Sequence, residues 1–441
     1  MYSKKYPAIT QGYGVFIEPD GGYIFPYEKS NGVKHALSPC RDLNVYACAI
    51  LEHCTGSYTV EEIVSMLNQK FDDTPPTLFS QVESFLDEAS QKGYVYYSNA
   101  PTQIKGLLQG STDYYTPSRV LLETTADCNL KCGHCLLSAG EPLHDELPTE
   151  QLIAILETLF NIGVKRLSLS GGEILTKKGW DELIHFCSQR FYSYVLTNGI
   201  WITETAADVM SCLNEVHISL YGSNAETHEK ISQVKGSFEQ AVKGIKRLTE
   251  RGVYVGVSVL MVPFNLDQLE DIVRMAVSLK CSIVRVGVIY PMGRAHNKEW
   301  ELTESQKEWL DIAIGDLQKK YKEIDVQWEE KIEKGSKCGA GFSRWAVASN
   351  GDVYPCSVFR LGIGNLVKND PADILKSPAA KFLQELEPPH EGLCGDCEYV
   401  YICKECHGQA FSHFSHVEVC RWAQQFVTAP EPLQSAVWKK S

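Results

Sequence analysis

Short apolar runs alternate with longer amphipathic stretches through the middle of the chain. The runs typical of strands cover residues 119–126, 165–170, 193–198, 215–220, 254–262 and 283–290. Helical spacing of apolar residues appears between them, for example over 149–162, and again around 303–321 where the region ends. Strands that alternate with helices are usually parallel and joined by crossover helices. The pattern therefore predicts an α/β fold, a complete or partial (β/α) barrel; with six strands, we expect a partial (β/α)6 TIM-like barrel.

The first 98 residues follow a different pattern and are expected to form a separate unit. Two β-rich runs flank an Asp-Gly-Gly turn at 20–22, which is a hairpin signal. Helical patterns follow, one of them opened by a capping box of Thr59 and Glu62, and a β-rich run closes the unit. A hairpin, three helices and a closing strand predict a winged helix-turn-helix domain. Since it lacks a basic recognition helix, we expect a peptide paired to its sheet edge rather than DNA.

Two further segments complete the predicted domain organisation. Residues 99–118 are polar and rich in Gly, Ser, Thr and Pro, which indicates a linker. The barrel is expected over 119–321, and 322–441 form a cysteine-rich, loop-rich domain.

Composition narrows the possible partners. The net charge of −13 argues against nucleic acid, whose phosphates require clustered Lys and Arg. The amino terminus lacks the apolar run of a signal peptide, and no later run reaches the roughly 18 apolar residues of a membrane span. We therefore expect a cytoplasmic protein with no membrane partner.

Sixteen cysteines are many for a reducing compartment, where clustered cysteines more often bind metal or do chemistry than form disulfides. Ten of them fall into tight or ordered spacings. The other six are scattered among apolar residues and are predicted to be small buried hydrophobes; they are Cys40, Cys48, Cys54, Cys187, Cys212 and Cys281.

The stretch CNLKCGHC places Cys128, Cys132 and Cys135 directly after the first barrel strand, at the end where such barrels do their chemistry. A structural zinc site needs a fourth ligand, and the neighbouring His134 is a poor one because adjacent residues rarely point at one metal. A cubane iron–sulfur cluster would use three thiolates and leave its fourth iron open to a chelating small molecule.

The next three strand ends also carry small or polar groups. Gly171, Gly172 and Glu173 follow the second strand, where glycines allow close backbone approach and a carboxylate can hold an ammonium. LTNG at 196–199 ends the third strand, and ISLYG at 218–222 ends the fourth. Each signal alone is equally typical of a turn, but four consecutive strand ends indicate a ligand site.

These motifs resemble the radical S-adenosylmethionine (radical SAM) superfamily over about 119–320. The resemblance implies that Cys128, Cys132 and Cys135 bind a 4Fe–4S cluster whose unique iron is chelated by S-adenosylmethionine (SAM). It further implies that Glu173 of the GGE motif holds the methionine ammonium. The implied neighbours of the ribose and adenine, together with the glycines, are His134, Gly171, Gly172, Thr197, Asn198 and Ser219. Ile174 departs from the usual proline and Tyr221 from the frequent aspartate, and neither change removes a ligand.

The carboxyl-terminal cysteines form a second pattern. Asn350-Gly351 is a hairpin turn that would bring Cys338 and Cys356 together, and C-x2-C pairs follow. Alone, these pairs favour a zinc ribbon or knuckle. Beside a radical SAM barrel they resemble the SPASM extension, although the last spacing is x2 instead of the common x3. That resemblance implies two auxiliary 4Fe–4S clusters, three clusters in all. One set is Cys338, Cys356 and Cys406, which leaves its fourth iron either open or with a ligand outside these cysteines; the other is Cys394, Cys397, Cys403 and Cys420.

The amino-terminal unit resembles the leader-recognition element of peptide maturases, and the three parts together most resemble subtilosin-type sactisynthases. This resemblance implies an oxidoreductase that modifies a ribosomally made precursor peptide. After hydrogen abstraction by a 5′-deoxyadenosyl radical, it would join a cysteine sulfur to a carbon in a thioether. The implied partners are the precursor peptide and a reductant such as flavodoxin or ferredoxin.

Other functions fit the same patterns. A carbon–carbon or carbon–oxygen crosslinking maturase or a peptide epimerase would use the same scaffold. From another class, the chain could be a zinc-bearing peptide-binding module without catalysis. No single acid–base residue stands out in the sequence.

Overall fold

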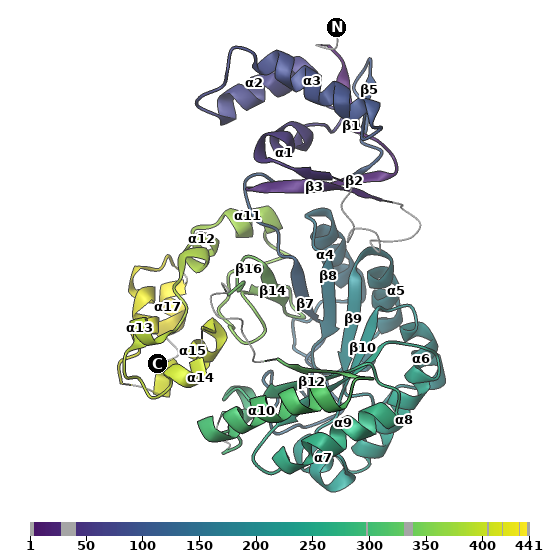
Figure 1. Cartoon of the computed structure of the whole chain (residues 1–441), viewed down its shortest axis with the longest axis vertical. Helices are drawn as coiled ribbons and strands as arrows, with labels where there is room; N and C mark the ends of the chain where they lie inside the picture. The colour runs from purple at the N-terminus through teal and green to yellow at the C-terminus, as the bar shows by residue number, and fades with distance from the viewer. Residues whose placement is uncertain are drawn as a thin grey trace.

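The computed structural model describes residues 4–27, 41–296, 299–329, 338–403, 405–416, 418–431 and 433–438. An amino-terminal domain sits at one end of a barrel-like α/β domain, and a carboxyl-terminal lobe lies beside it (Figure 1). Within the described residues no helix is both long and apolar enough to cross a bilayer.

The amino-terminal domain contains the predicted hairpin and helices. Its four-stranded sheet has the order β4-β3-β2-β6, and β1 pairs separately with β5. The hairpin joins β2 and β3 in antiparallel register across the predicted turn. The strands are β1 (Tyr6–Ile9), β2 (Tyr13–Glu18), β3 (Gly21–Pro26), β4 (Arg41–Leu43), β5 (Val95–Ser98) and β6 (Leu107–Gly110). The helices are α1 (Val45–Glu52), α2 (Val60–Lys70) and α3 (Leu78–Gln91).

Two details of this domain bear on the sequence predictions. The capping box is confirmed, since Glu62 N donates to Thr59 Oγ1 at 3.2 Å and Thr59 N donates to Glu62 Oε2 at 2.7 Å. The segment 99–118 is more than a spacer, because its strand β6 pairs in parallel with β2. Because β6 has only four residues and pairs with a strand far away in the sequence, it leaves little periodic signal.

The barrel domain contains all six predicted strands, paired in parallel in chain order. They are β7 (Arg119–Glu123), β8 (Arg166–Ser170), β9 (Tyr192–Thr197), β10 (Glu215–Ser219), β11 (Val255–Met261) and β12 (Ile283–Val288). Two parallel strands extend the sheet beyond the prediction: β13 (Asp325–Trp328) pairs with β12, and β14 (Arg344–Val347) pairs with β7. The covering helices are α4 (Thr149–Asn161), α5 (Trp180–Arg190), α6 (Glu204–Met210), α7 (Ala225–Ser232), α8 (Ser237–Thr249), α9 (Leu269–Ser278) and α10 (Glu304–Lys320).

Alternation along these strands separates an apolar outside from a polar inside. One set of residues, such as Leu122, Leu169 and Ile218, is fully buried against the helices. The alternate set, which includes Glu123, Ser170 and His217, faces the interior of the barrel. Packing on the helices thus stabilises the sheet, while the interior residues remain available for a ligand.

The carboxyl-terminal lobe begins with the predicted hairpin. β14 pairs antiparallel with β15 (Asp352–Tyr354), and the turn glycine Gly351 adopts a φ of +86°. β15 then pairs with the short β16 (Gly364–Asn365). An aromatic cluster of Phe359, Trp422 and Phe426 fills the core of the lobe. Its helices are α11 (Pro371–Lys376), α12 (Pro378–Glu385), α13 (Glu391–Cys394), α14 (Val400–Cys403), α15 (His407–His413), α16 (Arg421–Gln424) and α17 (Leu433–Trp438).

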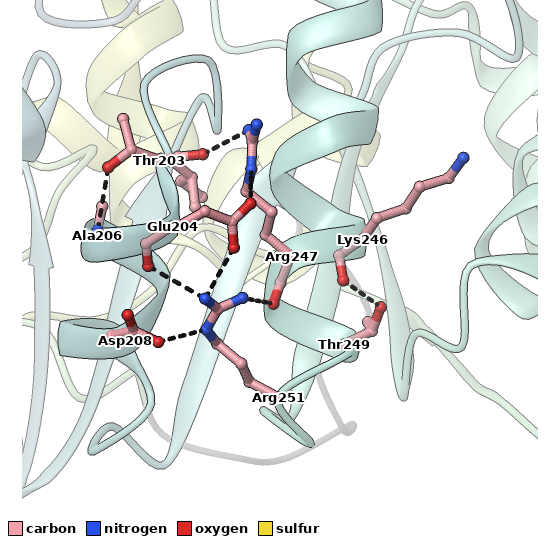
Figure 2. Close-up of polar contacts among 9 residues, drawn as sticks. Thr203, Glu204, Ala206, Asp208, Lys246, Arg247, Thr249 and Arg251 are labelled. Carbon is pink, nitrogen blue, oxygen red and sulfur yellow. Dashed lines mark hydrogen bonds and ion pairs between the residues drawn. The ribbon is translucent and has the colours of Figure 1, made fainter.

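A network of ion pairs connects α6 to α8 on the outside of the barrel (Figure 2). Arg251 Nε donates to Asp208 Oδ1 at 2.7 Å, and Arg251 Nη2 donates to Glu204 Oε2 at 2.8 Å. Arg247 Nε donates to the other oxygen of Glu204 at 2.8 Å. The side chain of Lys246 points away from this network in Figure 2.

The prediction for the six scattered cysteines is mostly confirmed. Cys48, Cys54, Cys187 and Cys281 are buried. The prediction is wrong for Cys212, which is exposed because it lies in the turn after α6 rather than on the inner face of an element. Cys40 lies outside the described residues.

Candidate active site

The loop after β7 carries the three cysteines of CNLKCGHC. Cys128, Cys132 and Cys135 line one cavity of about 530 Å³ at the carboxyl ends of the barrel strands. Backbone amides point at two of the sulfurs: Leu130 N lies 3.4 Å from Cys128 Sγ, and Ala139 N lies 3.4 Å from Cys135 Sγ. Amide donors of this kind stabilise a sulfur that carries negative charge. The arrangement therefore suits thiolate ligands.

Burial, in contrast, disfavours the thiolate form of the metal-free cysteines. It raises the pKa of Cys128 to about 11 and the pKa of Cys132 to about 12. Both thiols are therefore protonated near neutral pH in the metal-free chain, and metal binding has to release their protons.

Arg294 fixes the shape of this loop from the opposite side. It comes from the segment after β12, and its Nε donates to Cys132 O at 2.8 Å while Nη1 donates to Ala139 O at 2.6 Å. Gly293 beside it has a φ of +56°, and a Cβ there would lie 2.4 Å from Cys135 O. A chain segment about 160 residues away thus closes over the cysteine loop.

The two glycines of GGE are pressed against this same loop. Gly172 N donates to Thr125 O at 2.7 Å, and Glu173 N donates to Asp127 O at 2.8 Å. A Cβ on Gly172 would lie 2.0 Å from Asp127 O, and one on Gly171 would lie 2.3 Å from Thr125 O. The glycines are thus required for close packing of two chain segments, besides lining the cavity.

Glu173 lies behind the cavity wall and is 1% exposed. Its Oε1 accepts from Thr197 Oγ1 at 2.7 Å, and its Oε2 accepts from Asn198 N at 2.8 Å. Burial raises the pKa of this carboxyl group against the effect of these hydrogen bonds. Glu173 thus holds the 197–198 turn in place, and the implied contact with an ammonium stays a prediction.

The remaining predicted SAM neighbours lie on the same cavity. Thr197, Asn198 and Ser219 line it together with His134. The His134 ring stands edge-on to Tyr221 with centroids 4.7 Å apart. Burial lowers the pKa of His134 to about 4, so its ring is neutral. Its buried Nδ1 has no hydrogen-bond partner among the described residues, as expected for an atom that faces a ligand.

A segment of the carboxyl-terminal lobe completes the cavity wall. Ser357 and Val358, which follow Cys356, line the same cavity as the first cysteine loop. Arg360 anchors this segment by donating through both Nη atoms to the two oxygens of Glu123, with an Nη2–Oε2 distance of 3.1 Å. Because Glu123 ends β7, this buried ion pair joins the two cysteine-bearing parts of the chain.

The carboxyl-terminal cysteines divide into two groups in space. Cys394, Cys397, Cys403 and Cys420 line one small cavity, which matches the composition of the set implied above. Cys338 and Cys356 lie close enough for the charge of one to raise the pKa of the other. Cys406 N donates to Cys403 O at 2.8 Å, and its place with Cys338 and Cys356 stays a prediction. Within the described ranges, no three His, Cys, Asp or Glu side chains form a compact site for a single ion.

Comparison with known proteins names these parts. Residues 122–276 match the radical SAM superfamily, 338–398 match SPASM, an iron–sulfur cluster-binding domain, and 37–95 match coenzyme PQQ synthesis protein D (PqqD). The chain is 31% identical over 279 residues to the sporulation killing factor maturation protein SkfB of Bacillus subtilis (strain 168), covering 62% of this chain and 68% of SkfB. The chain belongs to the radical SAM superfamily.

A second curated protein and a solved structure are similar to this chain over nearly its whole length. The antilisterial bacteriocin subtilosin biosynthesis protein AlbA of the same strain is 25% identical over 438 residues, 96% of this chain and 97% of AlbA. The crystal structure of Streptococcus suis SuiB bound to S-adenosylmethionine has a TM-score of 0.64 at 15% identity, covering 94% of this chain and 98% of SuiB. The shared fold confirms the predicted arrangement of a PqqD-type domain, a TIM-like barrel and a SPASM domain.

Membership settles the class of chemistry. The protein is a radical SAM enzyme, and its cofactors are SAM with a 4Fe–4S cluster in the barrel and auxiliary iron–sulfur clusters in the SPASM domain. The amide-backed sulfurs of the cysteine loop and the unpartnered His134 nitrogen fit such ligands.

The sequence did not reveal several residues of the site. Arg294 and the pair Glu123–Arg360 act through contacts between segments that are distant in sequence. The run EVHIS in β10 carried a weak signal, because its alternation places Glu215, His217 and Ser219 on one face of the strand.

Proposed function

We propose that this radical SAM enzyme forms intramolecular thioether bonds between cysteine sulfurs and carbons of a ribosomally made precursor peptide. One observation carries the proposal: a single cavity is lined both by Cys128, Cys132 and Cys135 and by the segment that follows Cys356. A peptide in this cavity would lie between the radical source and an auxiliary cysteine set. The likeness to the subtilosin biosynthesis protein supports the same assignment.

The residues of the chain have distinct parts in this proposal. SAM bound at its cluster supplies, when reduced, a 5′-deoxyadenosyl radical that takes a hydrogen atom from a peptide carbon. His134, Gly171, Gly172, Glu173, Thr197, Asn198 and Ser219 would hold and orient SAM. Forming the C–S bond also releases a proton and one electron. The auxiliary sets, Cys338, Cys356 and Cys406 and the set Cys394, Cys397, Cys403 and Cys420, would hold the iron–sulfur groups that receive the electron.

The peptide's leader has a fitting groove in the amino-terminal domain. A cavity of about 640 Å³ lies between β4 and α3 and is lined by Leu43, Leu78, Val82 and Phe85. β4 is an outer strand of its sheet, so a peptide strand could add to it and bury apolar side chains under α3. SuiB has been crystallised with its precursor peptide SuiA, and the PqqD match supports a peptide partner here.

The groove assignment is tested with two phenylalanines of α3. Phe85 lines the groove, whereas Phe79, also half-buried on α3, does not. We expect Phe85→Ala to weaken binding of a fluorescent leader peptide about tenfold, and Phe79→Ala to leave it nearly unchanged. Fluorescence anisotropy measures both affinities. Equal effects of the two substitutions would remove the groove from the proposal.

We further propose a cytoplasmic enzyme that receives electrons from a flavodoxin or ferredoxin. A reducing compartment keeps its many cysteines available for iron. Replacing a chemical reductant by purified flavodoxin or ferredoxin in the assay tests the electron source.

We expect a short cysteine-containing peptide to be encoded beside this protein's gene, and that peptide is the substrate for a test of the reaction. After anaerobic incubation with SAM and reductant, a thioether product is lighter by two hydrogens per crosslink and its cysteine resists alkylation. A carbon–carbon or carbon–oxygen crosslink also loses two hydrogens but leaves the thiol reactive, and epimerisation leaves the mass unchanged. Cys128→Ala serves as the inactive control. Zinc without iron and sulfide in anaerobically purified protein would favour a binding module instead.

A further inference from the structure

The part of the amino-terminal domain that forms the groove between β4 and α3 is strongly acidic. Residues 41–95, which include the walls of this groove, contain nine Asp and Glu residues but only three Lys and Arg residues. His53 adds no charge near neutral pH, because burial lowers the pKa of its ring below the usual value. A peptide that approaches the groove therefore meets a negative field, which attracts cations and repels anions.

Each of the three cations in residues 41–95 already has an acidic partner. Arg41 Nη1 lies 3.1 Å from Glu88 Oε1, and Lys92 Nζ lies 2.7 Å from the same oxygen. Lys70 Nζ lies 3.1 Å from Asp113 Oδ1 in the segment after β6. Since the structure describes all of residues 41–95, no Lys or Arg of this part of the chain is left to neutralise other carboxylates.

Three exposed aspartates line the groove and form no ion pair with any described residue. Asp42 lies on β4, whereas Asp72 and Asp73 lie in the loop between α2 and α3. Arg41, which lines the groove beside Asp42, has its charge directed to Glu88. The groove thus presents uncompensated negative charge to its occupant.

An aromatic pair lies beside two of these aspartates. Tyr46 of α1 is 65% exposed, and its ring packs on that of Phe71 with centroids 5.2 Å apart. Phe71 directly precedes Asp72 and Asp73, and all four residues line the groove. We call these four residues the acidic corner. The face of an aromatic ring attracts a Lys or Arg side chain, and a carboxylate attracts the same groups.

We propose that the groove selects a cationic leader peptide, with a Lys or Arg side chain of the leader bound at the acidic corner. This inference rests on the proposed function, because it requires that the groove binds a leader. Neighbouring side chains of an added strand point to opposite faces. Apolar side chains can therefore enter the groove against Leu43 and Val82 while a cationic neighbour reaches the rim.

The same charges discriminate against other peptides. A leader with Asp or Glu at the acidic corner would bring like charges together, which weakens binding without any clash of shape. The apolar side chains of the groove would accept many peptide strands, whereas the acidic corner distinguishes among them by charge.

The charge preference is tested with three fluorescent peptides and the full-length enzyme. They are the leader of the cysteine-containing peptide expected beside the gene, and two copies in which its Lys and Arg residues are replaced by Gln or by Glu. Fluorescence anisotropy should show an affinity about tenfold lower for the Gln copy and lower still for the Glu copy. The affinity for the natural leader should also fall several-fold between about 50 mM and about 500 mM salt. Tight binding of a natural leader without Lys or Arg, or an affinity independent of salt, would overturn the proposal.

Single substitutions locate the effect. Asp72→Asn and Asp73→Asn should each weaken binding of the natural leader about two- to threefold, and Tyr46→Ala about threefold. Glu61→Gln removes one charge from the exposed first turn of α2, outside the groove, and is the matched control. Thermal unfolding of each variant reports on the fold. Equal effects of Glu61→Gln and Asp72→Asn would attribute the preference to the net charge of the domain and rule out the acidic corner.

Further outcomes separate this inference from the proposed function. If Phe85→Ala leaves leader binding unchanged, the groove is not the leader site and the binding step of the proposed function fails. If Phe85→Ala weakens binding and the charge variants do not, only the cation preference fails. Binding is measured without SAM or reductant, so a product other than a thioether would not alter these results. A dimer of the enzyme that Tyr46→Ala dissociates, with leader affinity unchanged, would assign the groove to a second copy of the chain instead.

Discussion

Single residues at the cysteine loop show how tightly the site is packed. Gly171 and Gly172 leave room for the backbone of Thr125 and Asp127, and Glu173 turns both carboxylate oxygens into the protein. The GGE motif, which the sequence predicts to contact a ligand, therefore also packs the segment after β8 against the segment after β7. The position of the cluster cysteines depends on it.

This packing predicts the effect of one methyl group. Gly172→Ala would bring its Cβ to 2.0 Å from Asp127 O, so the loop before Cys128 has to move. We expect a loss of about 1–3 kcal/mol in unfolding free energy and reduced iron uptake on anaerobic reconstitution. Thermal unfolding and iron analysis measure the two effects. Gly140→Ala, where a Cβ would meet no atom within 4 Å, is the matched control and should retain both properties.

At the scale of elements, the alternation of side chains along each strand gives the barrel sheet an apolar outer face and a polar inner face. The outward residues of β7 to β12 are buried against helices, whereas inward ones such as Glu123, Ser170 and His217 line the cavity. Helices such as α6 and α8 contribute by covering the sheet and by connecting to each other at the surface.

The connection between α6 and α8 predicts a modest and salt-sensitive stabilisation. Arg251 joins Glu204 and Asp208, but both carboxylates are largely exposed, with side-chain exposures of 66% and 68%. Arg251→Ala should lower the melting temperature only slightly at low salt, and by less at 1 M salt. Lys246→Ala, which removes a cation outside the network, should have no effect. A large drop in the melting temperature of Arg251→Ala that persists at 1 M salt would contradict this account of the network.

In the whole molecule, two polar contacts join the barrel to the domains on either side of it. Glu123 and Arg360 join the barrel to the SPASM domain beside the cavity. At the other end of the barrel, Lys165 inserts between the aromatic rings of the amino-terminal sheet, with Nζ 3.3 Å from the Phe16 centroid and 4.1 Å from the Tyr23 centroid. The amino-terminal domain thus packs near the amino ends of the strands (Figure 1), whereas the cavity lined by Cys128, Cys132 and Cys135 lies at their carboxyl ends.

Lys165 makes the contact between the two domains sensitive to pH. Burial lowers its pKa to about 7, and nearby Glu18 opposes the shift. Between about pH 7 and its usual value of 10.5, the unfolded chain therefore binds the proton that the folded chain has released. Stability from this group rises with pH across that window and is lowest below pH 7.

Lys165→Met tests this contribution. Relative to wild type, the variant should lose on the order of 1–2 kcal/mol of pH dependence between pH 7 and 10, after allowance for solvent screening. Thermal unfolding across this range measures the difference. Lys105→Met removes an exposed lysine over the Tyr96 ring and is the control. Parallel stability curves for wild type and Lys165→Met would contradict the lowered pKa.

The sequence by itself determined the elements and the class of chemistry. Apolar periodicity is a local property, so the six barrel strands, the hairpin at 20–22 and the helix that begins after Thr59 were all predicted within a few residues. Cysteine spacing is equally local, and it predicted a cluster site in the loop at 128–135 and, through the family resemblance, SAM as its ligand. Both signals survive without knowledge of the tertiary structure.

Only the tertiary structure decided how these pieces cooperate. It placed the segment after Cys356 on the same cavity as Cys128, and it paired Glu123 with Arg360 and His217 with Glu215. It also showed that β6 belongs to the first sheet and that Cys212 is exposed. Such features depend on burial and on contacts between distant segments, which change pKa values and hydrogen-bond partners without leaving a periodic pattern in the chain.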